Sequence, residues 1–96
     1  MSLDYVSEKF EHEAIRTLAT GSGTIQDRLA NAHGAFHSVR VEDFPGDLGE
    51  RFRAIIDRFA PAAALKLSDE DAREVADELY SISIGVNRVC HERELA

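Results

Sequence analysis

A hydrophobic stripe with helical spacing recurs four times along this chain, with breaks between the repeats. Its clearest copy runs through Ile25, Leu29, Ala32, Phe36 and Val39, in alternating steps of four and three residues. This spacing places all five side chains on one face of a helix, where they can be buried together. Each stripe therefore predicts one helix, and the four stripes together predict an all-α chain.

The chain length and the short connections predict how these helices are arranged. A chain of 96 residues is large enough for one domain with a single core. We predict one helical domain over residues 1–96, with helices at about 3–20, 24–38, 46–59 and 69–93. Short connections favour an antiparallel, up-and-down four-helix bundle. Its predicted core consists of Leu18, Leu29, Phe36, Phe52, Ile55, Phe59, Leu79 and Val86.

Capping residues mark the predicted helix ends. Gly21 suits the left-handed position after the first helix, and Thr24 followed by Asp27 resembles a capping box for the second. Ser68 precedes a run of acidic residues, which is typical of a helix start. The segment 81–84 alternates polar and apolar residues as a strand would, but its helical flanks and the lack of a partner strand favour helix.

The charge and the cysteine content exclude several classes of function. The net charge of −7 disfavours nucleic-acid binding, and the cluster Arg51, Arg53 and Arg58 is interleaved with acidic residues that offset it. No apolar run is long enough to span a membrane. The start of the chain carries Asp4 and Glu8 rather than a basic and then apolar leader. With Cys90 as the single cysteine, we expect a cytoplasmic protein.

His33 and His37 are the candidate metal ligands. They lie four residues apart on the second predicted helix, a spacing at which two histidines can bind one zinc ion. A third ligand would have to come from another segment, with His12, Glu13 or His91 as candidates. Two histidines at the edge of a buried face are the simpler interpretation, so no metal or other cofactor is predicted.

No constellation in the sequence predicts catalysis. Cys90 and His91 are adjacent, and adjacent residues on a helix do not face each other. Cys90 also falls on the inward stripe, which predicts a buried, inert thiol. The glycine-containing segment 20–24 lacks the spacing and the lysine of a phosphate-binding loop. The chain is therefore predicted not to be an enzyme.

Four apolar residues lie off the main stripes and are the candidate interface residues. Tyr80 and Ile84 are neighbours on the last helix, and Tyr5 and Ile15 lie on the first. Such residues could form a contact surface for a partner or for a second copy of the chain, since aromatic anchors are typical of interfaces. Single exposed apolar residues are also common on proteins that bind nothing there.

Three stretches of the chain carry a resemblance to known proteins. These are Leu3 to Lys9, Arg16 to Gly21 and Ile25 to Ala32, and an element at Glu42 to Pro45 accompanies them. Together they resemble small bacterial helical proteins of unknown function. The resemblance covers most of the chain and implies a bacterial cytosolic origin, but it supplies no activity, ligand or site.

The sequence therefore supports two hypotheses from different classes. The first is a non-enzymatic protein–protein interaction or regulatory module that forms a homodimer or binds a protein partner through Tyr5, Ile15, Tyr80 and Ile84. The alternative is a metal- or ligand-binding helical protein that uses His33 and His37. Stoichiometric metal in the purified protein would favour the second.

Overall fold

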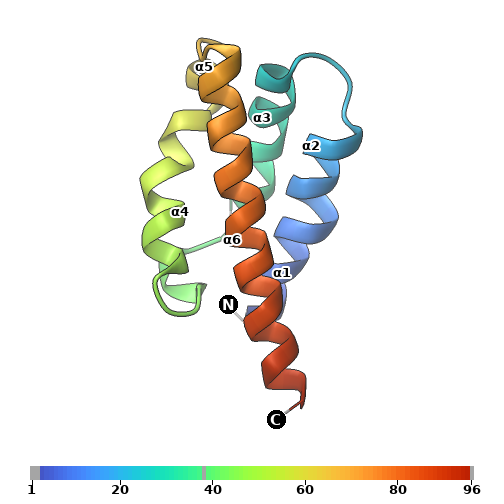
Figure 1. Ribbon diagram of the computed structural model, residues 1–96, viewed down its shortest axis with the longest axis vertical. Coiled ribbons are helices and arrows are strands. Elements are labelled where there is room, and N and C mark those ends of the chain that lie inside the picture. Colours follow the sequence, from blue (N-terminus) through green and yellow to red (C-terminus); the bar gives the residue numbers. More distant parts are fainter. Residues whose placement is uncertain (1–2, 38, 96) are drawn as a thin grey trace.

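The computed structural model describes residues 3–37 and 39–95, and within these ranges it contains helices and no strand. Four helical rods alternate in direction along the chain, so that each runs antiparallel to the one before it (Figure 1). The predicted all-α, up-and-down arrangement is therefore confirmed.

The four rods are built from helices of three kinds. The first rod is continuous and consists of α1 (Leu3–Glu8), the π-helix η1 (Lys9–Ile15) and α2 (Arg16–Thr20). The second is α3 (Ile25–His33) with the 3-10 turn η2 (Gly34–Phe36). A connection containing the 3-10 turn η3 (Val41–Asp43) leads to the third, α4 (Leu48–Ile56) with the 3-10 turn η4 (Asp57–Phe59). The short helix α5 (Pro61–Ala64) precedes the fourth, α6 (Asp69–Leu95).

The helix bounds agree with the sequence except at a few ends. The first rod spans residues 3–20 as predicted. α4 begins at Leu48, two residues later than predicted, because Gly46 adopts a positive φ of 58° and forms a turn before it. The predicted end of the second helix, Ser38, lies outside the described residues. α6 extends to Leu95, two residues beyond its predicted end.

The π-helical segment of the first rod keeps its apolar residues on one face. Val6, Phe10, Ala14 and Leu18 follow one another in steps of four, and all four are buried. On an α-helix each such step drifts by about 40°, which amounts to about 120° over three steps. A π-helix bonds residues five apart and so holds more residues per turn, which offsets this drift. The segment η1 contains Phe10 and Ala14, where this correction is needed.

The turn between α2 and α3 uses its two glycines differently from the prediction. Gly21 is extended, with φ −64° and ψ 158°, and the left-handed residue is Gly23, with φ 94°. A Cβ on Gly21 would lie 2.4 Å from the carbonyl oxygen of Thr17, so this position requires glycine for space rather than for handedness. The capping box is confirmed: Thr24 Oγ1 accepts from the Asp27 amide, and Asp27 Oδ2 accepts from the Thr24 amide, both at 3.1 Å.

The start of α6 is capped and is tied to α3. Ser68 Oγ accepts a hydrogen bond from the Asp71 amide at 3.1 Å, which confirms the predicted cap. Gln26 Nε2 donates to the Leu67 carbonyl oxygen at 3.0 Å and to Asp69 Oδ1 at 2.8 Å. The N-terminal ends of α3 and α6 are therefore held side by side.

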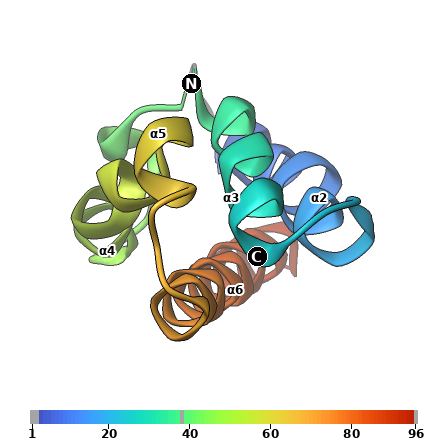
Figure 2. The same ribbon diagram turned by 90° about the horizontal axis from the view of Figure 1, so that it is seen from above.

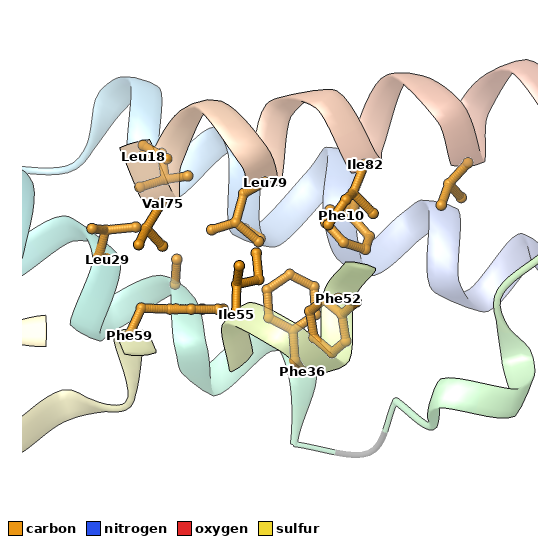
Figure 3. Close-up of a cluster of buried hydrophobic side chains, with 14 of the residues drawn as sticks. Phe10, Leu18, Leu29, Phe36, Phe52, Ile55, Phe59, Val75, Leu79 and Ile82 are labelled. Atoms are coloured by element: carbon orange, nitrogen blue, oxygen red, sulfur yellow. The ribbon is translucent and has the colours of Figure 1, made fainter. Parts of the chain in front are cut away.

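The core lies between α6 and the other three rods. Figure 2 shows α6 on one side of the bundle, with α4, α3 and the first rod arranged around it and α5 between α4 and α3. All five phenylalanines are buried, and the rings of Phe10, Phe36 and Phe52 pack with centroids 4.7 to 5.9 Å apart (Figure 3). Every predicted core residue is buried: Leu18, Leu29, Phe36, Phe52, Ile55, Phe59, Leu79 and Val86.

Candidate functional site

The side of α6 that faces away from the other rods carries the most prominent exposed apolar side chain. Ile84 is 61% exposed, and Leu65 after α5 is 58% exposed; these are the two large apolar residues exposed in the described part of the chain. Tyr80 lies one turn before Ile84 and is half-buried against the core. Ile84 is therefore the apolar centre of this face, with Tyr80 at its edge.

The other two predicted interface residues belong to a different rod and are less exposed. Ile15 is half-buried and packs against the core. Tyr5 is also half-buried, and Lys9 Nζ lies 5.4 Å from its ring centroid. Lys9 donates a hydrogen bond to Glu13 at 2.8 Å, which raises the pKa of the Lys9 ammonium above its ordinary value. Ile84 is the one predicted interface residue that the structure exposes.

A first hollow lies between α2, α3 and α6, and its lining includes two arginines. It has a volume of about 190 Å³, and we call it the basic hollow. Its lining residues are Leu18, Ile25, Arg28, Arg73, Ala76, Asp77 and Tyr80. Arg28 Nη1 donates to the Leu18 carbonyl oxygen at 3.1 Å, while Arg28 Nε is buried and has no acceptor among the described residues. The basic hollow therefore combines an apolar floor with charged groups.

A second hollow, of about 230 Å³, lies between the first rod and the C-terminal half of α6. Its lining residues are Ser7, Glu11, Asn87, Cys90 and His91, and Ser7 Oγ donates to Asn87 Oδ1 at 2.7 Å. Cys90 was predicted to be buried; it is half-buried against the core and lines this hollow together with His91. The sequence could not predict this, because a helical wheel does not show how far a neighbouring helix covers each position.

The structure places His33 and His37, the candidate metal ligands, in different surroundings. His33 is the last residue of α3, and its ring packs edge-on against Phe59 at a centroid distance of 5.1 Å. The 3-10 turn η2 follows it, and 3-10 residues advance by about 120° each instead of about 100°. His37 is therefore turned away from His33, and it is exposed. Within the described residues, no three His, Cys, Asp or Glu side chains are grouped as metal ligands.

Two arginines of the predicted basic cluster face acidic residues of α6. Arg51 Nη2 pairs with Glu78 and donates to Ser81 Oγ at 2.8 Å. Arg58 lies 3.9 Å from Glu74, and Arg53 is exposed. The contacts of Arg51 and Arg58 connect the third rod to α6, which is a structural role.

The basic hollow is the feature that sequence reasoning missed. Arg73, Ala76, Asp77 and Tyr80 follow one another at helical spacing and so share one side of α6. That signal was present in the sequence. The position of Arg28 against this side depends on how α3 packs on α6, and periodicity within one helix contains no information about it.

Comparison with known proteins adds no family to this description. Protein-family models, curated protein sequences and solved structures were searched, and none of them matches this chain. Among the described residues, no helix combines the length and the apolar content needed to cross a membrane.

Proposed function

We propose that this protein is a non-enzymatic interaction module that pairs with a second copy of itself through the outward side of α6. The observation that carries the proposal is the 61% exposure of Ile84 at the middle of a 27-residue helix. An isoleucine side chain gains about 2 kcal/mol when it is moved from water into an apolar contact. A contact at Ile84 would remove this exposed apolar surface from water.

The charge distribution along α6 favours a second copy as the occupant. Residues 69–78 contain six acidic side chains and one arginine, whereas residues 79–91 contain Arg88, His91 and no Asp or Glu. Two copies of α6 that pair in antiparallel orientation about Ile84 would place the acidic segment 69–78 of one copy opposite the C-terminal end of its partner's α6, so the two acidic segments stay apart. A parallel pair would instead bring the two acidic halves together, which like-charge repulsion disfavours.

A twofold axis at Ile84 gives each neighbouring residue a suitable counterpart. In such a pair, a residue that follows Ile84 by a given number of positions in one copy faces the residue that precedes Ile84 by the same number in the other copy. Each contact therefore occurs twice, as in any isologous interface. Arg88 of one copy then lies opposite Tyr80 of the other, a favourable cation–π combination. His91 lies opposite Asp77 in the same way. Because a single exposed isoleucine anchors the contact, we expect a weak dimer, with a dissociation constant of about 0.1 mM.

Sedimentation equilibrium of the full chain at increasing concentration tests this proposal. We expect the wild-type protein to dimerise, and Ile84→Asp to remain monomeric because each dimer would bury two carboxylates at its centre. Leu65→Asp is the matched control, since Leu65 has nearly the same exposure but lies outside α6. A wild-type protein that stays monomeric at about 1 mM, or equal effects of the two variants, would contradict the proposal.

The proposed setting is the cytosol, which is consistent with a chain containing a single cysteine. A regulatory role would follow if dimerisation changes which surface a further protein can reach. No second function is proposed for His33 and His37, because one packs against Phe59 and the other is turned away from it.

A further inference from the structure

We propose that the basic hollow binds a small organic anion, namely a carboxylate attached to a single ring or a short apolar chain. This binding activity goes beyond self-association and uses residues from three helices. Arg28 comes from α3, Arg73 and Tyr80 from α6, and Leu18 from α2.

The lining of the basic hollow contains more positive than negative side chains. Arg28 and Arg73 both line the basic hollow, and neither forms an ion pair within the described part of the chain. Asp77 is the one acidic residue of the lining, so the two guanidinium groups leave an excess of positive charge. A guanidinium binds a carboxylate through paired hydrogen bonds, which makes a carboxylate a suitable counter-ion here.

Arg28 has a buried hydrogen-bond donor that is not satisfied within the described residues. This side chain is half-buried, and its Nη1 donates to the Leu18 carbonyl oxygen, but its buried Nε meets no acceptor among the described residues. A shielded donor without an acceptor costs free energy, particularly on a charged group. An anion in the hollow would supply charge and acceptors to this guanidinium after a small side-chain adjustment.

The size and the apolar part of the lining suit a single ring or a short apolar chain. Leu18, Ile25 and Ala76 contribute aliphatic surface, and Tyr80 contributes a ring and a hydroxyl group. The volume of about 190 Å³ slightly exceeds that of cavities of about 150 Å³ that hold benzene. Inorganic phosphate would leave the aliphatic surface without a partner. The lining therefore favours an anion with an apolar body over a bare inorganic anion.

Titration with sodium benzoate, followed by two-dimensional NMR of the full chain, tests the site. We expect saturable shifts of backbone amides around Arg28, Ala76 and Tyr80. Benzyl alcohol has the same ring without the charge, and inorganic phosphate has the charge without the ring, so both should bind at least threefold more weakly. Equal binding of benzyl alcohol would overturn the charge argument, and tighter binding of phosphate would overturn the apolar argument.

Two exposed positions give variants with opposite expected effects. Arg73→Gln should weaken benzoate binding by about threefold, and Asp77→Asn should strengthen it by a similar factor. Both side chains are exposed on α6, so neither change should prevent folding. Arg53→Gln is the matched control, because Arg53 is an exposed arginine of α4 away from the hollow. Equal weakening by Arg53→Gln, or no saturable shift in the wild-type protein, would refute the site.

Asp77 and Tyr80 also belong to the register proposed for the dimer. The titration is therefore repeated on Ile84→Asp, which should be monomeric and should retain benzoate binding. If the wild-type protein is monomeric and binds benzoate, the dimer is refuted and the anion site is supported. Dimerisation without benzoate binding would refute the anion site alone.

Discussion

At the scale of single residues, a glycine, which has no side chain, can decide how closely two elements approach. Gly49 is buried in α4, and a Cβ there would lie 2.5 Å from the carbonyl oxygen of Val41 and 3.0 Å from its Cγ1. The third rod therefore packs against η3 at a distance that excludes any side chain. Gly34, in η2, has nothing within 4 Å of the equivalent position.

This contrast predicts opposite effects of one substitution. Gly49→Ala should lower the free energy of unfolding by about 2 kcal/mol, because a methyl group collides with backbone that has to move. Gly34→Ala should leave it unchanged or raise it by about 0.5 kcal/mol, since the backbone there is helical and alanine reduces the entropy of the unfolded chain. Urea unfolding followed by circular dichroism measures both values. Equal values for the two variants would contradict this account of Gly49.

The candidate interface residues show how far the position of a residue around a helix predicts the exposure of its side chain. The angular position of Ile84 on α6 predicted exposure, and the structure confirms that exposure. Ile15 and Tyr80, which were also predicted to lie off the main stripes, are half-buried and pack against the core. A helical wheel gives the direction of a side chain, but whether a neighbouring helix covers that direction depends on tertiary packing.

At the scale of elements, apolar periodicity predicted the four rods and their buried faces. Ser68 and Thr24 are local signals, and each one marks a helix start that the structure confirms. The 3-10 ends of the second and third rods and the π-helix were not predicted. These segments change the winding of a helix so that its apolar residues stay against the core, and that requirement arises from the packed bundle rather than from local propensity.

The π-helix leads to a prediction about deletions. Removing His12, which is exposed, would leave Val6, Phe10, Ala14 and Leu18 in steps of four, three and four, the spacing of a regular α-helix. We expect this deletion variant to fold with a free energy of unfolding within about 1 kcal/mol of the wild-type value, as a one-residue π-insertion would allow. Thermal and urea unfolding provide the measurement.

Deletion of Asp77 from α6 is the matched control. Asp77 is also exposed, but the surrounding helix is α-helical throughout. Its loss would rotate Val75 by about 100° relative to Leu79 and Val86 and remove part of the core, at a cost of several kcal/mol. If the His12 deletion were as damaging as the Asp77 deletion, the π-helix would be required for stability and this interpretation would be wrong.

At the scale of the whole molecule, the charge is distributed unevenly. The net charge is −7, and six acidic side chains lie in the first ten residues of α6. Arg51 and Arg58 of the third rod contact Glu78 and Glu74 from this group. The half of α6 after Tyr80 lacks acidic residues as far as His91, and the proposed dimer depends on this asymmetry.

Reversal of one charge tests the asymmetry separately from the apolar contact. Arg88→Glu places a carboxylate opposite Tyr80 and beside the acidic half of the second copy, twice in each dimer. We expect the dissociation constant of the dimer to rise by about tenfold, and added salt to reduce this difference because it screens exposed charges. Arg53→Glu changes the net charge by the same amount from an exposed position on α4. Sedimentation equilibrium of both variants separates the two causes: equal weakening would attribute the effect to net charge, whereas weakening by Arg88→Glu alone supports the antiparallel register around Ile84.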